Sequence, residues 1–283
     1  MALPTYAGPL ERTWYYGFRI LCGLIFFFLM APILVIIPLS FNVQPYFTYT
    51  REMLTLDPAG FSMRWYDAFW NSTAWMTAIR NSLIIGIAST LIATALGTIA
   101  ALGLSRREMP FRGLIMGLLI SPMIVPLIIS AAGMFFFYSS VGLAGTFPGV
   151  ILAHAALGTP FVIITVTATL VGFDNSLTRA AASLGASPAT TFRKITMPLI
   201  MPGIISGALF AFITSFDEIV IVLFLAGVEQ RTIPREMWSG IRESISPTIL
   251  AVATILVMFS IALLTTIELL RRRSERLRGM APQ

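Results

Sequence analysis

The stretch between Arg112 and Asp174 contains no Asp, Glu, Lys or Arg, and this feature most limits what the chain can fold into. A bilayer core about 30 Å thick is crossed by a helix of roughly 20 apolar residues. The stretch is too long for one crossing, and the cluster from Ser139 to Gly145 divides it. Over the chain, 57% of residues are hydrophobic and 11% are charged, against about 25% charged in soluble domains. The chain is therefore predicted to be an integral membrane protein, which excludes a soluble enzyme. Its single cysteine excludes a disulfide scaffold.

Six apolar runs of the required length are predicted as transmembrane helices of one membrane domain over residues 1–283. They cover about residues 20–40, 81–104, 113–138, 148–172, 197–226 and 244–267. Backbone polar groups in lipid have to be paired within the segment, so each run is predicted to be α-helical. Pro122 and Pro126 are expected to kink the third run.

The basic residues predict the orientation, because Lys and Arg accumulate in cytoplasmic segments. With the N-terminus inside, 13 of the 19 basic residues lie on the inner side and the other 6 on the outer side. Both termini are therefore expected in the cytoplasm, and the first run is expected to be an uncleaved signal-anchor. The net charge of +6 is then explained by the basic residues of the cytoplasmic segments. The lipid bilayer is therefore the expected partner, and binding to nucleic acid is not expected. The inner set is Arg12, Arg19, Arg106, Arg107, Arg112, Arg179, Arg193, Lys194, Arg271, Arg272, Arg273, Arg276 and Arg278.

The segment from Phe61 to Trp70, between the first two runs, mixes aromatic and charged side chains. This composition favours a helix lying in the membrane interface. A docking surface for a partner on the outer side is the alternative.

The loop between the fourth and fifth runs is predicted to form a helix, a glycine turn and a second helix. Asp174 or Asn175 can cap the first helix, and Gly185 is the left-handed stop residue expected just past its end. Ser187 can cap the second helix, with Pro188 in the first position, where a missing N–H costs nothing. The loop is therefore too structured to be a mere connector.

Within this loop, Ala180, Ala181 and Leu184 share one helix face, and the small alanines permit close approach of another surface. Here the sequence resembles the permease subunits of bacterial ABC importers. Their cytoplasmic motif reads E-A-A-x-x-x-G, nine further residues, then I-x-L-P. Two positions depart from it: Arg179 stands where the family has Glu, and Met197 where it has Leu. The matching positions are Ala180, Ala181, Gly185, Ile195 and Pro198.

The resemblance implies an all-α type I ABC importer permease fold, with six transmembrane helices and cytoplasmic coupling helices at residues 174–198. It implies a multi-pass protein of the bacterial inner membrane. The implied partners are two ATP-binding subunits, a second homologous permease subunit and a periplasmic solute-binding protein. The residues implied to dock with the ATPase are Ala180, Ala181, Leu184, Gly185, Ala186, Ser187, Ile195 and Pro198.

The chain is not expected to be an enzyme. A phosphate-binding loop needs a lysine directly after glycine, and the only lysine, Lys194, follows Arg193. ATP and Mg²⁺ are therefore expected on the partner ATPase, with no cofactor, metal or catalytic residue on this chain. The single histidine, His154, is expected to make a helix-packing hydrogen bond, and a proton relay is the alternative.

Two segments, residues 60–66 and 214–218, are similar to the second permease of spermidine/putrescine systems. The resemblance therefore implies import of a polyamine. Permeases for opines, phosphonates or amino-acid-like solutes carry similar segments, so the same importer class for another small solute stays open. A secondary transporter is a further alternative, although the chain shows no inverted repeat.

Asp217 and Glu218 interrupt the fifth apolar run, where each carboxylate costs roughly 2.5–3.5 kcal/mol on insertion scales. One reason for the pair is a cationic solute in the transport pathway, which makes both acids substrate-path candidates. The alternative reason is structural: a break in the fifth helix near the outer surface, with the acids paired to Arg231 or to a companion subunit. Neighbouring residues on a helix point about 100° apart, so both acids cannot face one pore.

Overall fold

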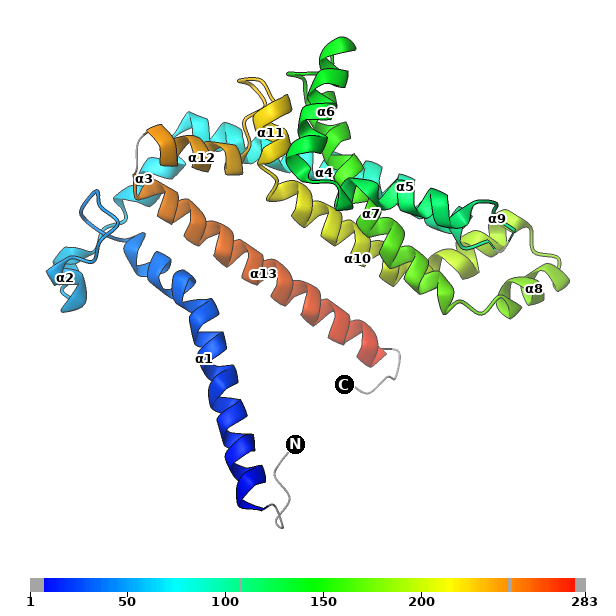
Figure 1. The fold of residues 1–283 in the computed structure, drawn as a ribbon, viewed down its shortest axis with the longest axis horizontal. Coiled ribbons are helices and arrows are strands. Elements are labelled where there is room, and N and C mark those ends of the chain that lie inside the picture. The colour runs from blue at the N-terminus through cyan, green and yellow to red at the C-terminus, as the bar shows by residue number, and fades with distance from the viewer. Residues whose placement is uncertain (1–7, 107, 244–245, 278–283) are drawn as a thin grey trace. The chain divides into compact units, whose positions relative to one another are not determined.

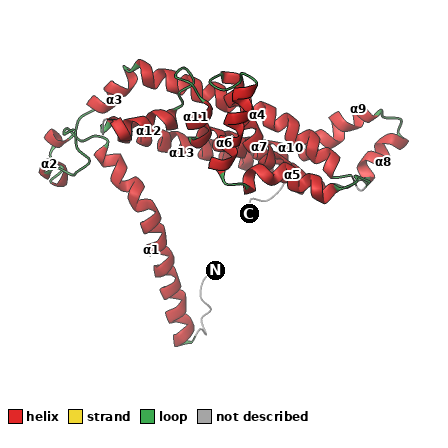
Figure 2. Ribbon diagram, turned by 45° about the horizontal axis from the view of Figure 1, so that its top comes forward, coloured by secondary structure: helices red, strands yellow, loops and turns green. Residues whose placement is uncertain are grey.

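The computed structural model describes residues 8–106, 108–243 and 246–277. These residues form helices and loops, without a β-strand among them (Figure 2). The chain divides into two compact units, Thr73–Ser239 and the pair of segments Met1–Ser72 and Gly240–Gln283. Arg107, Arg278 and the predicted start of the last span at residue 244 lie outside the described residues. A single permease domain over residues 1–283 stays a prediction.

Three long helices form the core of the unit at residues 73–239 and lie side by side in Figure 1. Small residues line their contacts, as in other membrane helix bundles, because lipid offers no hydrophobic force that would drive helices together. A Cβ atom added to Gly158 would lie 2.9 Å from the Cβ of Ala211, and one added to Gly207 would lie 2.7 Å from the Cα of Val162. The three helices are α4 (Thr73–Leu104), α7 (Phe147–Val171) and α10 (Met197–Phe216).

The third predicted span is not one kinked helix but two helices, α5 (Arg112–Ile124) and α6 (Leu127–Ser140), bent by 100°. Pro126 disfavours the helical conformation of the residue before it, and Val125 is extended, with φ −67° and ψ 136°. Pro122 lies inside α5 without ending it. Of the two expected kinks, therefore, the one at Pro126 breaks the helix.

The fifth predicted span is also interrupted. Helix α10 ends at Phe216, and a short helix, α11 (Val220–Leu225), follows after three residues. Ile221, Val222 and Leu225 of α11 are buried in a cluster with side chains of α4, α6 and α7. Helix α12 (Ile233–Glu243) comes next in the chain. The helix break that the structural alternative offers for the paired acids is therefore present.

The other unit contains α1 (Pro9–Leu39), α2 (Arg51–Leu54), α3 (Arg64–Trp70), α13 (Thr248–Leu277) and a 3-10 turn at Pro58–Gly60. The aromatic segment expected in the membrane interface is tied to the end of α1. The Trp65 Nε1–H donates to the carbonyl of Asn42 at a distance of 2.7 Å, and the Ser40 and Tyr66 hydroxyls are 2.7 Å apart. Trp65 and Phe69 are buried, so part of the segment serves internal packing.

Four helices among the described residues are long and apolar enough to cross a membrane, or five if the bent pair α5–α6 is one crossing. They are α1, α4, α7 and the continuous helix Pro188–Phe216. Helix α13 adds a shorter described apolar part, Thr248–Ala262. The chain is therefore an all-helical, multi-pass membrane protein.

Candidate functional site

The coupling loop, residues 174–198, begins with helix α8 (Ser176–Ser183). The Asp174 carboxylate accepts hydrogen bonds from the backbone N–H of Ser176 (2.8 Å) and from its hydroxyl (2.6 Å). These bonds, the side-chain bond first, hold the pKa of Asp174 below its ordinary value. Asn175 occupies the capping position without a side-chain bond, so Asp174 is the residue that organises the start of α8.

Helix α8 ends in the predicted glycine turn. The N–H of Ala186 donates to the carbonyl of Ala181, and the N–H of Gly185 donates to the carbonyl of Ala182; the N···O distance is 3.0 Å in both bonds. This pair of bonds is the Schellman motif, which satisfies carbonyls left free at the helix end. Gly185 has φ +79°, a left-handed conformation that glycine adopts without steric cost. The turn therefore depends on glycine because of its backbone conformation, since no atom crowds the position of its missing Cβ.

The predicted docking face of α8 is only partly available to a partner. Leu184 is 88% exposed and Ala180 is exposed, whereas Ala181 is 7% exposed and packs within this chain. A leucine side chain left in solvent directly after the last residue of α8 is what a docking contact would cover. Docking of these residues onto an ATPase stays a prediction.

The second helix of the loop begins where the sequence predicts. The Ser187 hydroxyl accepts the N–H of Thr190 over 3.3 Å, and Pro188 is the first helical residue of α9 (Pro188–Thr191). A π-helical turn over Phe192–Thr196 then joins α9 to α10. Pro198 lacks an N–H, and in a regular α-helix its ring would clash with the carbonyl four residues earlier. The wider π-helical turn before it avoids this clash. Ile195 is half-buried in this turn.

The structure separates the two acids of the fifth span. Asp217 ends α10 and is exposed, whereas Glu218 is 6% exposed. The Glu218 carboxylate accepts the N–H groups of Val220 (2.7 Å) and Ile221 (2.8 Å), and so caps α11. Glu218 therefore stabilises the helix break, whereas Asp217 has an exposed side chain.

Of the partners offered for the acids in the structural alternative, Arg231 lies 3.6 Å from Glu236 and is not paired with Glu218 among the described residues. The side chain that faces Glu218 is His154, whose Nε2 lies 3.8 Å from a carboxylate oxygen. The Nδ1 atom of His154 lies 2.8 Å from the Ser215 hydroxyl, which confirms the expected helix-packing hydrogen bond.

Two residues that the sequence reasoning missed hold the loop after α11. The Asn81 amide donates to the carbonyls of Glu229 (2.7 Å) and Arg231 (2.9 Å), and the Arg235 guanidinium donates to those of Ala226 and Gly227. An Asn near the start of a predicted span is the only sequence signal for the first contact. Its partners are 148 and 150 residues away.

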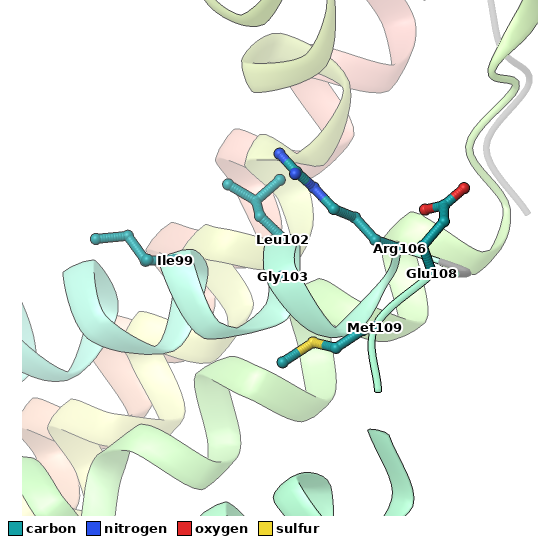
Figure 3. Close-up of a pocket in the computed structure, with 6 residues that line it drawn as sticks. All are labelled: Ile99, Leu102, Gly103, Arg106, Glu108 and Met109. Carbon is teal, nitrogen blue, oxygen red and sulfur yellow. The ribbon is translucent and has the colours of Figure 1, made fainter. Parts of the chain in front are cut away.

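A cavity of about 530 Å³ lies beside the end of α4 (Figure 3). Arg106 and Glu108 are its charged residues, and none of the predicted site residues lines it. The lining residues are Ile99, Leu102, Gly103, Arg106, Glu108 and Met109.

The helical architecture is that of an ABC importer permease. A crystal structure of a bacterial ABC transporter involved in the import of the acidic polysaccharide alginate contains a chain with the same fold. The TM-score is 0.76 at 16% identity, over 94% of this chain and 99% of that chain. The chain belongs to the family of binding-protein-dependent transport system inner membrane components, whose profile matches residues 93–276.

Individual relatives extend over most of the chain. The spermidine/putrescine transport system permease protein PotC of Haemophilus influenzae is 31% identical, over 88% of this chain and 94% of that protein. The putrescine transport system permease protein PotI of Escherichia coli is 34% identical, over 82% of each. The trehalose transport system permease protein SugB of Mycobacterium tuberculosis is 30% identical, over 71% of this chain and 72% of that protein.

Proposed function

We propose that this chain is the membrane-spanning subunit of an ATP-driven importer that passes a polyamine from a periplasmic binding protein into the cytoplasm. The observation that carries the choice of solute is Asp217, an exposed carboxylate at a break between two apolar helices. A carboxylate at such a place can replace part of the water lost by an ammonium group. Relatives that transport spermidine and putrescine support the same assignment.

The other subunits are part of the proposal. Two ATP-binding subunits would dock on the coupling loop, hold ATP and Mg²⁺, and supply the hydrolysis that this chain does not perform. A second homologous permease subunit would complete the pathway. The exposed Leu184 and Ala180 support the docking, because a short helix presenting small and apolar side chains fits a groove.

Solute competition tests the proposed substrate class. Cells that express the whole importer are expected to take up labelled spermidine, and excess unlabelled putrescine is expected to compete with it, because both solutes carry several ammonium groups. Excess trehalose is expected to leave the uptake unchanged, because it has no charge for Asp217 to bind. Competition by trehalose without competition by putrescine would contradict a polyamine pathway and favour a sugar importer like that of the trehalose relative.

We further propose that both termini and the coupling loop lie in the cytoplasm, as the charge distribution predicts. Cysteine labelling with an impermeant thiol reagent tests this orientation in a Cys22→Ser background. Ser187→Cys is expected to be shielded in intact cells, whereas Val228→Cys is expected to react from outside. Val228 suits the test because it is 76% exposed, while Thr232 in the same loop is 3% exposed.

The control for shielding is permeabilisation of cells that express this chain without the ATP-binding subunits, after which Ser187→Cys is expected to react because its side chain is exposed when no ATPase covers the loop. Reaction of Ser187→Cys from outside in intact cells would reverse the orientation.

A further inference from the structure

Four buried polar side chains meet at the break in the fifth span, inside the unit at residues 73–239. Ser89 comes from α4, His154 from α7, Ser215 from α10, and Glu218 from the break itself. The surrounding buried side chains are apolar and include Val150, Ile221 and Val222. Polar groups in such a place are costly unless they are paired, so the order of their hydrogen bonds has structural consequences.

The contacts form a chain that leads from α4 to Glu218. The hydroxyls of Ser89 and Ser215 are 3.0 Å apart, and the Ser215 hydroxyl is 2.8 Å from Nδ1 of His154. On the other side of the ring, Nε2 is 3.8 Å from a Glu218 carboxylate oxygen. That distance is too long for a hydrogen bond, and Nε2 has no hydrogen-bond partner in the described part of the chain.

The contact with Glu218 decides which nitrogen carries the hydrogen. A hydroxyl has one proton, and a neutral imidazole has one N–H and one acceptor nitrogen. The Ser89 hydroxyl can donate to the Ser215 hydroxyl (3.0 Å) or to the carbonyl of Gly86 (3.1 Å), so the serines alone permit either order. If Ser89 donates to Ser215 and Ser215 donates to Nδ1, then the ring proton sits on Nε2 and faces the carboxylate. The reverse order would point the Nε2 lone pair at Glu218, whose oxygens already accept two backbone N–H groups as a carboxylate does. The first order is attractive and the second repulsive.

We propose that His154 is a positioning residue for Glu218. The Ser215 hydroxyl at Nδ1 and the Glu218 carboxylate on the other side of the ring together favour the neutral Nε2–H form, and that N–H keeps the Glu218 carboxylate turned onto the N–H groups of α11. The neighbouring Asp217 is thereby held at a fixed place at the end of α10. The consequence for transport rests on the proposed function, whereas the position of the proton on the ring does not.

The position of the proton is measured directly by solid-state NMR of the ¹⁵N-histidine-labelled importer complex in lipid bilayers. His154 is the only histidine of this chain, so subtracting the spectrum of a His154→Gln complex isolates its signals. A protonated Nε2 and an unprotonated Nδ1 are expected. Replacing Ser215 with alanine is expected to shift the Nδ1 signal, because its donor is lost. An Nδ1–H tautomer or an imidazolium in the wild-type complex overturns the proposal.

Two substitutions separate positioning from packing. The amide nitrogen of Gln can take the place of Nε2, and that of Asn the place of Nδ1, so only His154→Gln can still donate toward Glu218. Uptake per assembled complex is expected to fall about tenfold in His154→Asn and clearly less in His154→Gln, since only the first leaves the buried Glu218 carboxylate without the donor that faces it. Thr167→Val is the matched control, because it removes a buried hydroxyl without a hydrogen-bond partner from the same helix. It is expected to change neither uptake nor spectrum.

Failure of this inference is distinguishable from failure of the proposed function. If the solute is not a polyamine, the tautomer and its response to Ser215→Ala are still measured on the same complex. If both His154 variants match wild type in uptake per complex, the positioning role is wrong even when polyamine uptake is normal. If the His154 variants do not assemble, the difference between the wild-type and Ser215→Ala spectra still isolates the Nδ1 signal of His154 and decides the order of the hydrogen bonds.

Discussion

Uptake of polyamine per assembled complex is expected to fall about tenfold when Asp217 is replaced by asparagine. The substitution keeps the shape of the side chain and removes its charge. One ion pair near 4 Å contributes on the order of 4 kcal/mol at an effective dielectric of 20, and losing a third of this is about tenfold in occupancy. The measurement is uptake of labelled spermidine and putrescine, normalised to the amount of complex purified from the same membranes.

Glu229→Gln is the matched control for charge, because Glu229 is an exposed acid of the same unit that lies outside the helix break. It is expected to transport normally. Glu218→Gln has a different expected result: an amide nitrogen would face the N–H groups of α11, so the yield of complex is expected to fall rather than uptake per complex. Normal uptake per complex in Asp217→Asn would remove the structural support for a cationic solute. The polyamine assignment would then depend on the relatives alone.

Transport is also expected to fall about tenfold when Gly185 is replaced by valine, while insertion into the membrane stays normal. A β-branched residue at φ +79° adds roughly 1–2 kcal/mol of backbone strain, and 1.4 kcal/mol corresponds to a tenfold change in population. The strain would unwind the Schellman turn and displace Leu184 from its docking position. Hydrolysis of ATP by the complex is then expected to lose its dependence on the binding protein.

Two controls separate backbone strain from side-chain bulk. Asparagine tolerates the left-handed conformation, so Gly185→Asn is expected to keep most of the transport. Gly172→Val adds the same side chain just before the loop, at φ −87°, where the new Cβ meets only the carbonyl oxygen of Thr169 at 3.9 Å. Near-normal transport is expected there. Full transport in Gly185→Val would show that this turn does not couple hydrolysis to transport.

The local structure of the coupling loop could be read from the sequence because each signal acts over a few residues. The turn at Gly185 and the cap at Ser187 lie where the residue types predict. The docking face was less predictable. The sequence analysis assigns Ala180 and Ala181 to one face, but adjacent helix residues point about 100° apart, and the structure buries Ala181 and leaves Ala180 exposed.

The break in the third span shows a limit of the same kind. The prolines at 122 and 126 both signal a disturbed helix, yet only the second separates two helices, bent by 100°. A proline fixes its own φ and restricts the residue before it, but the size of the bend depends on what the two halves pack against. Helix α6 packs beside α11, a contact between segments about 90 residues apart in the chain.

The sequence by itself determined that the chain crosses a membrane and that residues 174–198 form a helix, a glycine turn and a second helix, because hydrophobic length, capping and glycine turns are local properties. Only the tertiary structure decided the roles of the paired acids. Asp217 and Glu218 are adjacent in sequence but differ in burial. Asp217 ends α10 with an exposed side chain, whereas Glu218 is buried and caps α11 beside His154. The side chains that surround the helix break come from distant parts of the chain: Ser215 bonds to His154, 61 residues away, and to Ser89, 126 residues away. No local sequence pattern encodes which side chains these helices bring together.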